Sequence, residues 1–146
     1  MTLTVDANVW VGALDLNDPA AETCRALLLR IEKRAVRLHS PLLLPVEVAA
    51  AIGRKTRNAR QGARAAQWVR AFPGHAWQPL SEACAEAAEN FAASLFLRGA
   101  DAVYVAVAYL SGSTLLTYDA EVAERAAKVV RVMSPEAWLK QRSPRS

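Results

Sequence analysis

The sequence predicts an α/β fold in three layers, with a short central parallel sheet covered by helices on both faces. Short apolar segments alternate with helical segments along the 146 residues, as in parallel sheets with helical crossovers. Of these residues, 53% are hydrophobic and 22% are charged, so one domain of this length buries a core without disulfides or a structural metal. We expect a single domain over residues 1–140 and a loose polar tail over 141–146.

Short apolar segments and helix-start signals define the first half of the chain. Leu3–Val5 favours a strand that ends before Asp6, and we expect the chain to loosen after it. Asp18 and Pro19 are a typical helix start, and Pro45 suits a helix's first turn. The expected elements are a strand over 3–5, a helix over 20–35, a strand over 36–39, a helix from about 45 through 52 that Gly53 breaks or bends, and a basic helix to about 72.

Capping residues divide the second half in the same way. Ser81 is a suitable N-cap for an alanine-rich helix that Gly99 ends. The helix after it is apolar almost all round and should be buried. The expected elements are an extended segment around Trp77, a helix between Ser81 and Gly99, a helix over 102–110, a strand over 114–117, a helix over 120–127 and a strand over 129–133.

The cysteines and the start of the chain bear on its location. Cys24 and Cys84 lie far apart with no Cys or His at metal-ligand spacing, so we expect reduced core thiols. Asp6 interrupts the start of the chain, where a signal peptide needs a basic patch and then an apolar stretch. No apolar run reaches the roughly 20 residues of a membrane span. We therefore expect a cytoplasmic protein.

Positive charge is concentrated in one segment. Residues 24–72 hold 11 Lys or Arg against two Glu, within a chain whose net charge is +4. Four arginines in this segment recur at helical spacing, so we expect them to share one helix face that follows a phosphate backbone. They are Arg54, Arg57, Arg60 and Arg64. A solvated helix face is the simpler interpretation, but the scarcity of acidic neighbours favours an acidic partner, either nucleic acid or an acidic protein segment.

Four acidic residues lie in apolar surroundings at positions where ligands bind in parallel sheets. Asp6 and Asp119 directly follow predicted strands, and Glu47 and Asp101 lie near helix starts. Ligands bind beyond the carboxyl ends of parallel strands. Carboxylates without adjacent cations are suitable ligands for Mg²⁺ or Mn²⁺, so the four acids are candidate metal ligands for phosphoryl chemistry.

Each acid also has a structural interpretation. Asp101 and Glu47 could interact with the helix macrodipole, which contributes about 0.3–1 kcal/mol each. Asp119 could be the N-cap of the helix that follows it. Asp6 is the hardest to explain by capping, because it follows a buried strand. Residue types and spacing alone leave the metal site and these interpretations open.

The sequence around the four acids resembles the PIN-domain family, and within it the small VapC-type ribonuclease toxins of toxin–antitoxin pairs. No single segment is specific, but all four acids occur in the expected order and local sequence. The resemblance extends from Leu3 to Met133. The segments that carry it are Val5–Val9, Pro45–Val48, Ala100–Ala108 and Thr114–Asp119.

This resemblance implies a PIN-like fold and a metal-dependent endoribonuclease, a hydrolase that leaves a 5′-phosphate and a 3′-hydroxyl. It assigns catalysis and Mg²⁺ or Mn²⁺ binding to Asp6, Glu47, Asp101 and Asp119. Asn8 and Thr117 are implied to be polar supports around them, although family members often carry Ser or Thr at the position of Asn8. The implied partners are an RNA substrate, a second copy of the chain in a homodimer, and a cognate antitoxin in a larger hetero-oligomer.

Other functions compete with this interpretation. One is a non-catalytic PIN-like module that binds RNA or protein, and another is a housekeeping RNA-processing nuclease. A phosphotransfer receiver domain fits less well, because Asp6 is a single acid and Lys128 does not lie at a strand end. Core packing or dimer contact is the expected role of most tryptophans, except that Trp10 lies near the proposed site entrance.

Overall fold

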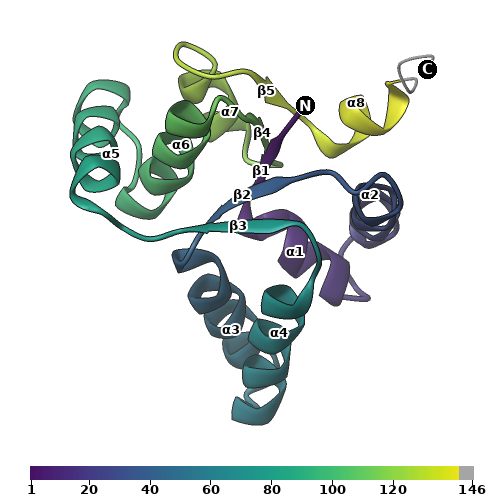
Figure 1. Cartoon of the computed structure of the whole chain (residues 1–146). Helices are drawn as coiled ribbons and strands as arrows, with labels where there is room; N and C mark the ends of the chain where they lie inside the picture. Colours follow the sequence, from purple (N-terminus) through teal and green to yellow (C-terminus); the bar gives the residue numbers. More distant parts are fainter. Residues whose placement is uncertain (142–146) are drawn as a thin grey trace.

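The computed structural model describes residues 1–141, which form five strands and eight helices (Figure 1). Most of the predicted tail, residues 142–146, lies outside the described residues. The elements are β1 (Leu3–Val5), α1 (Ala7–Leu14), α2 (Ala21–Lys33), β2 (Leu38–Pro41), α3 (Leu43–Thr56), α4 (Ala59–Ala71), β3 (His75–Gln78), α5 (Glu82–Leu95), α6 (Gly99–Ser111), β4 (Thr114–Leu116), α7 (Ala120–Ala126), β5 (Val132–Met133) and α8 (Pro135–Lys140).

The five strands form one parallel sheet in the order β3-β2-β1-β4-β5. The central strand β1 pairs with β2 on one side and β4 on the other, with Leu3 opposite both Leu38 and Thr114. The predicted short parallel sheet is therefore confirmed. Because β1 and β4 are parallel neighbours, the residues that follow them emerge at the same edge of the sheet.

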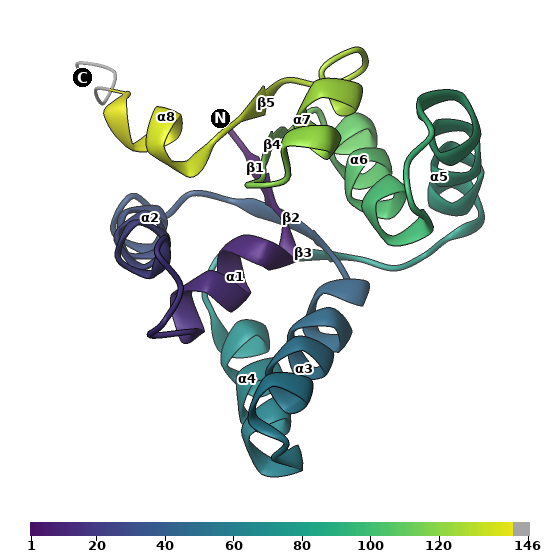
Figure 2. The ribbon, with the colours of Figure 1, turned by 180° about the vertical axis from the view of Figure 1, so that it is seen from behind.

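Helices cover the sheet on both sides. Figures 1 and 2 show α5, α6 and α7 together on one side and α2 with α8 on the other. Helix α6 contacts β1, β2 and β4 and packs against α5, and it is buried over most of its length, as predicted. Within residues 1–141 no single helix is long and apolar enough to span a bilayer, although α5 and α6, bent at 118°, pass by length and composition as a pair.

Several predicted boundaries were wrong. The chain does not loosen after β1 but forms α1 directly, and Gly53 lies inside an uninterrupted α3. Strand β2 lies two residues later than predicted, and β5 contains only Val132 and Met133. Helix α8 was not predicted, although Ser134 caps it and Pro135 occupies its first turn.

The four arginines do not share one helix face, so that prediction was wrong. Helix α3 ends before Arg57, which adopts a left-handed conformation with φ 52°. Asn58 then caps α4 by accepting a hydrogen bond from the backbone N–H of Gln61, 3.1 Å away. The two helices form a hairpin that projects from the rest of the molecule (Figures 1 and 2). They approach closely at Gly62, where a Cβ atom would lie 2.8 Å from the carbonyl oxygen of Ala49.

The prediction that Trp10 lies near the site entrance was also wrong. Trp10 is fully buried, and its Nε1 donates a hydrogen bond to the carbonyl oxygen of Val5 across 3.3 Å. Its ring packs edge-on against Trp68 and Phe72 and lies beside His75. The ring therefore belongs to the core that fixes α1 beneath the sheet and against α4.

Candidate functional site

Asp6 is the most buried of the four candidate acids, with 7% of its surface exposed. It follows β1 and occupies the N-cap position of α1, but its side chain makes no capping hydrogen bond. Its backbone N–H donates to the carbonyl oxygen of Leu116 at the end of β4, 2.9 Å away. Capping therefore does not explain this carboxylate, which lies where β1 and β4 end together.

Two polar side chains surround the Asp6 carboxylate. The Thr117 hydroxyl donates to Asp6 Oδ2 across 2.8 Å and accepts a hydrogen bond from the backbone N–H of Asp119 at 3.0 Å. Asn8 Nδ2 lies 3.4 Å from the same Asp6 oxygen and 3.3 Å from Thr117 Oγ1. The implied supporting positions of Asn8 and Thr117 therefore do lie around Asp6, where they hold its orientation.

The surroundings of Asp6 disfavour its negative charge. The pKa of Asp6 is raised to about 6, mainly by burial and additionally by the charges of Asp101 and Glu47. Hydrogen bonds from Thr117 and the backbone of Ala7 act in the opposite direction. Among residues 1–141 no Lys or Arg forms an ion pair with it.

Glu47 is the second acid with a raised pKa. It lies in α3, and burial is the main cause of the shift, with a further contribution from Asp101. The nearby Tyr104 hydroxyl and Arg98 counteract it. The geometry is not that of a formed hydrogen bond, however, because Glu47 Oε1 and the Tyr104 hydroxyl are both buried without a partner among the described residues. Glu47 Oε1 is therefore a buried oxygen with an unused acceptor capacity.

Arg98 forms ion pairs with the remaining two acids, Asp101 and Asp119. Its Nε lies 3.1 Å from Asp101 Oδ2, and its Nη2 lies 3.7 Å from Asp119 Oδ2. Asp101 lies in the first turn of α6. Asp119 is the N-cap of α7, and its Oδ1 accepts from the backbone N–H of Val122 at 3.0 Å. The capping interpretation of Asp119 is therefore correct, but it uses only one of the two carboxylate oxygens.

The donor set fits a hard divalent cation in its chemistry. All four candidate ligands are carboxylates, Asp6 is buried without a cation, and Glu47 Oε1 has no partner among the described residues. Oxygen ligands of this kind suit Mg²⁺ or Mn²⁺. Within residues 1–141, however, no three acidic, His or Cys side chains are arranged to hold one ion together. The side chains of two acids are instead engaged by Arg98.

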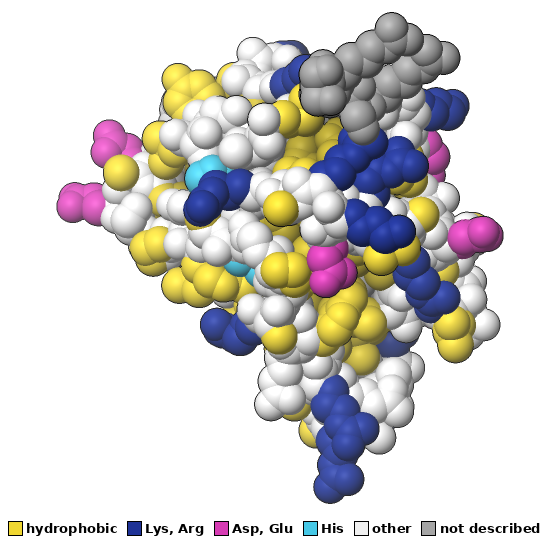
Figure 3. Space-filling view, turned by 45° about the vertical axis from the view of Figure 1, so that its right-hand side comes forward, with side chains coloured by type: hydrophobic (Ala, Val, Ile, Leu, Met, Phe, Trp, Pro, Cys, Tyr) yellow, Lys and Arg dark blue, Asp and Glu magenta, His cyan; other side chains and the backbone are white. Residues whose placement is uncertain are grey.

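The α3–α4 hairpin carries a basic surface. Its four candidate arginines are exposed and belong to none of the ion pairs formed within residues 1–141. Arg54 and Arg57 line a shallow hollow with Lys55, whose Nζ pairs with Asp15 Oδ2 at 2.5 Å. Figure 3 shows Lys and Arg side chains at the tip of the hairpin, at the bottom of the view. Arg60 and Arg64 lie on α4.

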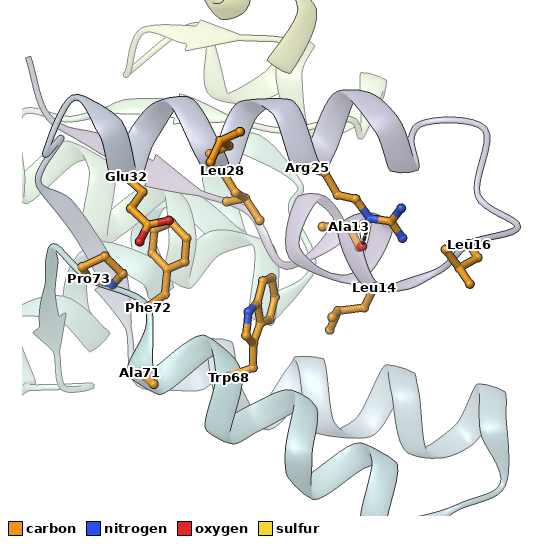
Figure 4. Close-up of a pocket in the computed structure, with 11 residues that line it drawn as sticks. Ala13, Leu14, Leu16, Arg25, Leu28, Glu32, Trp68, Ala71, Phe72 and Pro73 are labelled. Atoms are coloured by element: carbon orange, nitrogen blue, oxygen red, sulfur yellow. Dashed lines mark hydrogen bonds between the residues drawn. The ribbon is translucent and has the colours of Figure 1, made fainter.

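A separate apolar groove of about 720 Å³ lies between α1, α2 and α4 (Figure 4). Leu14, Leu28, Trp68 and Phe72 line it. Arg25 lies at its edge, where its Nε donates to the carbonyl oxygen of Ala13 across 2.9 Å. The volume falls within the roughly 300–1,000 Å³ that ligand pockets typically have, and the lining is mostly apolar, with Arg25 and Glu32 as its charged residues.

Comparison with known families identifies the family to which this fold belongs. The model of the PIN domain matches residues 3–129, a range that includes all four acids. The chain belongs to the PIN-domain family. No curated protein sequence is similar enough to count as a match.

Several solved structures have a fold similar to that of this PIN domain. The chain has a TM-score of 0.71 and 13% identity to a structure of VapBC2 from Rickettsia felis bound to a promoter DNA fragment, covering 92% of this chain and 98% of that one. FitAcB from Neisseria gonorrhoeae gives a TM-score of 0.70 and 18% identity, covering 92% of this chain and 99% of that one. VapC20 from Mycobacterium tuberculosis, a sarcin-ricin loop cleaving toxin, gives a TM-score of 0.70 and 18% identity, covering 90% of this chain and 98% of that one. These similarities show a shared fold.

Two residues at the site of this PIN domain were not among the predicted ones. Arg98 contacts Asp101 and Asp119, and Tyr104 lies beside Glu47. The spacing of Arg98 three residues before Asp101 is a usable sequence signal for the first contact. Tyr104 gives no such signal, since in sequence it is one more large residue on a buried helix.

Proposed function

We propose that this PIN domain is a metal-dependent endoribonuclease and acts as the toxin of a toxin–antitoxin pair. One observation carries the proposal most directly, the buried Asp6 carboxylate whose pKa is raised by burial and by the charges of Asp101 and Glu47. A buried carboxylate beside like charges is unfavourable unless a cation compensates it. The family membership adds support, because PIN domains are typical of nucleases.

The residues of the chain have separate roles in this proposal. Asp6, Glu47, Asp101 and Asp119 hold the cation, and Thr117 and Asn8 fix the orientation of the Asp6 carboxylate. A bound Mg²⁺ or Mn²⁺ supplies Lewis acidity for attack by water on an RNA phosphodiester, which gives a 5′-phosphate and a 3′-hydroxyl. Glu47 Oε1 has no hydrogen-bond partner among the described residues, so it is free to act as a ligand of the cation.

The activity test is cleavage of a mixed pool of tRNA, ribosomal RNA and mRNA by antitoxin-free protein in Mg²⁺, Mn²⁺ or EDTA. We expect specific fragments that require metal and that disappear with Asp6→Asn, Asp101→Asn and Glu47→Gln. The matched control is Glu124→Gln, which makes the same chemical change at an exposed glutamate of α7 that forms no ion pair within residues 1–141. It should cleave like the wild type.

Two other results point to different functions. Folded protein that binds RNA without cutting any of the pool supports the non-catalytic module. Cleavage that trims defined precursors and does not arrest growth supports a housekeeping nuclease. Cleavage that persists in EDTA, or in the Asp6→Asn variant, contradicts the proposed metal-dependent mechanism.

Metal binding can be measured without activity. A ligand that binds only the folded state stabilises it by about 2.7 kcal/mol at a hundred times its dissociation constant. For a domain of this size that corresponds to a rise in Tm of roughly 5–10 °C. We expect this rise with saturating Mg²⁺ or Mn²⁺ and a much smaller one for Asp6→Asn. An unchanged Tm in the wild type contradicts a metal site.

We propose a cognate antitoxin as the protein partner and the apolar groove between α1, α2 and α4 as its binding site. Several solved structures of similar fold are complexes of the VapBC type. The groove exposes Leu16, Leu29 and Trp68 to solvent, and an apolar groove between helices suits an amphipathic segment of a partner. We also propose a homodimer, which sedimentation of the antitoxin-free protein tests.

A further inference from the structure

Among the described residues, the Arg98 side chain forms hydrogen bonds and ion pairs only with acids of the proposed metal site. Its side chain is 82% exposed and its guanidinium contacts Asp101 Oδ2 at 3.1 Å and Asp119 Oδ2 at 3.7 Å. It is the only basic residue of the described part of the chain that forms an ion pair with any of the four candidate acids. The position of the guanidinium therefore depends on these two carboxylates.

The side chain of Arg98 has no structural task besides these contacts. Arg98 is the N-cap residue of α6, but its side chain makes no capping hydrogen bond. The cap contact comes from its backbone, whose carbonyl oxygen accepts from the N–H of Ala102 at 2.9 Å. Truncation of the side chain consequently leaves the start of α6 intact.

The two carboxylates are occupied in this arrangement. Asp119 uses Oδ1 to cap α7 and presents Oδ2 to Arg98, and Asp101 also presents Oδ2 to Arg98. A divalent cation that uses both of these Oδ2 atoms competes with the guanidinium for the same negative charge. Monodentate contacts at 3.1 and 3.7 Å from an exposed side chain are weak enough to be displaced.

We propose that Arg98 is the resident counter-ion of the acidic site, which a divalent cation must displace from Asp101 and Asp119 in order to bind. This inference rests on the proposed metal-dependent function. It adds a competing group that belongs to the chain itself and that lowers the apparent metal affinity.

The structure has space for the displaced side chain. Arg98 is 82% exposed, so its side chain can turn into solvent, away from the hollow of about 220 Å³ that it lines together with Asp101, Asp119, Phe96 and Arg125. Arg125 is already anchored there by hydrogen bonding to the carbonyl oxygen of Phe96 and by pairing with Glu121 at 2.7 Å. Arg98 can therefore leave the two acids without disturbing a packed core.

The test is the affinity for Mn²⁺, measured by isothermal titration calorimetry on the whole chain without RNA. Arg98→Ala should bind Mn²⁺ about two- to fivefold more tightly than the wild type, the range that an exposed ion pair gives. Arg98→Lys retains the charge and should stay close to the wild type. Arg131→Ala is the matched control, because it removes an exposed arginine that forms no ion pair within residues 1–141.

The direction of the change separates competition from structural damage. A merely structural Arg98 predicts equal or weaker Mn²⁺ binding in Arg98→Ala, and that result overturns the inference. A gain in Mn²⁺ affinity in Arg131→Ala also overturns the inference, and so does a gain in Arg98→Lys that is as large as in Arg98→Ala. In both cases the loss of the positive charge at Arg98 does not explain the gain. Saturable binding to the wild type without a gain in Arg98→Ala leaves the proposed function standing. No saturable binding to either protein overturns both.

Discussion

Thr117 and Thr4 are both buried beside the central strands of the sheet, but only the Thr117 hydroxyl has hydrogen-bond partners among the described residues. Thr117 donates to Asp6 Oδ2 at 2.8 Å and accepts from the Asp119 backbone N–H at 3.0 Å. Thr4 lies on β1 with an exposure of 0% and an unpartnered Oγ1. The same residue type therefore supports the acidic site at one position and only fills space at the other.

The two threonines give a matched pair of variants. Thr117→Val leaves a buried carboxylate oxygen and a backbone N–H without their partner, and we expect a loss of about 1–3 kcal/mol in the free energy of unfolding. Thr4→Val removes a buried hydroxyl that bonds to nothing within residues 1–141, and we expect no loss or a small gain. Urea unfolding in EDTA measures both. Equal effects of the two substitutions contradict the supporting role of Thr117.

The raised pKa of Asp6 predicts a pH-dependent stability. A shift from 3.8 to about 6 corresponds to about 3 kcal/mol. The folded state binds this proton more tightly than the unfolded chain, so the contribution is present at low pH and is lost as pH rises from about 4 through 6. Burial of Glu47 acts in the same direction.

His75 opposes the effect of Asp6 on the pH dependence of the wild-type stability. Burial lowers the pKa of His75 to about 4, so the unfolded chain binds its proton first and stability rises with pH over nearly the same interval. The measurement is therefore the difference in unfolding free energy between Asp6→Asn and the wild type in EDTA. The unfolding free energy of Asp6→Asn should rise relative to that of the wild type from about pH 4 to pH 7. A difference that is independent of pH contradicts the raised pKa of Asp6.

The basic hairpin predicts salt-dependent RNA binding. Arg57→Gln with Arg60→Gln should weaken RNA binding and reduce the slope of log affinity against log salt by about 0.7 for each phosphate that the variant no longer neutralises. Fluorescence anisotropy with a labelled single-stranded RNA in EDTA measures the slope. Arg131→Gln is the control for removal of an arginine charge elsewhere. If the double variant keeps the wild-type slope, this surface binds something other than the RNA backbone.

A simple rule of parallel sheets predicted that Asp6 and Asp119 lie together, whereas Glu47 and Asp101 were assigned to the candidate site by the family resemblance. Asp6 and Asp119 come soon after two strands that pair side by side, so the expectation that they share one edge needed only the strand assignment. The contact of Arg98 with Asp119 could not be predicted, because it depends on how α6 and α7 are placed relative to each other. Local spacing carries no information on that.

The failed predictions have two causes, which are tertiary packing that overrides a local signal and local capping signals that were not used. Gly12 suggested a loosened chain, yet it lies inside α1. The glycine lets α1 and α2 approach closely, because a Cβ atom there would come 2.9 Å from the sulfur of Cys24 on α2. Arg57 suggested a continuous basic helix, yet one left-handed residue turns the chain. Asn58, a favourable N-cap, is the signal that was available for that turn.

The apolar groove predicts a variant that separates antitoxin binding from RNA cleavage. Leu29 is 52% exposed on α2 and lines the groove, so Leu29→Glu should leave the fold and the antitoxin-free cleavage rate unchanged. A charge introduced into an apolar contact should weaken antitoxin binding by more than about tenfold, which corresponds to about 1.4 kcal/mol. Co-purification with a candidate antitoxin, followed by titration of the complex, measures the change in affinity.

Leu110 supplies the control for this prediction. It is 54% exposed on α6 and is not part of the groove, so Leu110→Glu introduces the same charge into an equally exposed leucine elsewhere. The antitoxin should bind this variant and inhibit its cleavage as in the wild type. If Leu29→Glu is inhibited as strongly as Leu110→Glu, the groove is not the antitoxin site, because a segment packed against Leu29 cannot tolerate a buried unpaired carboxylate.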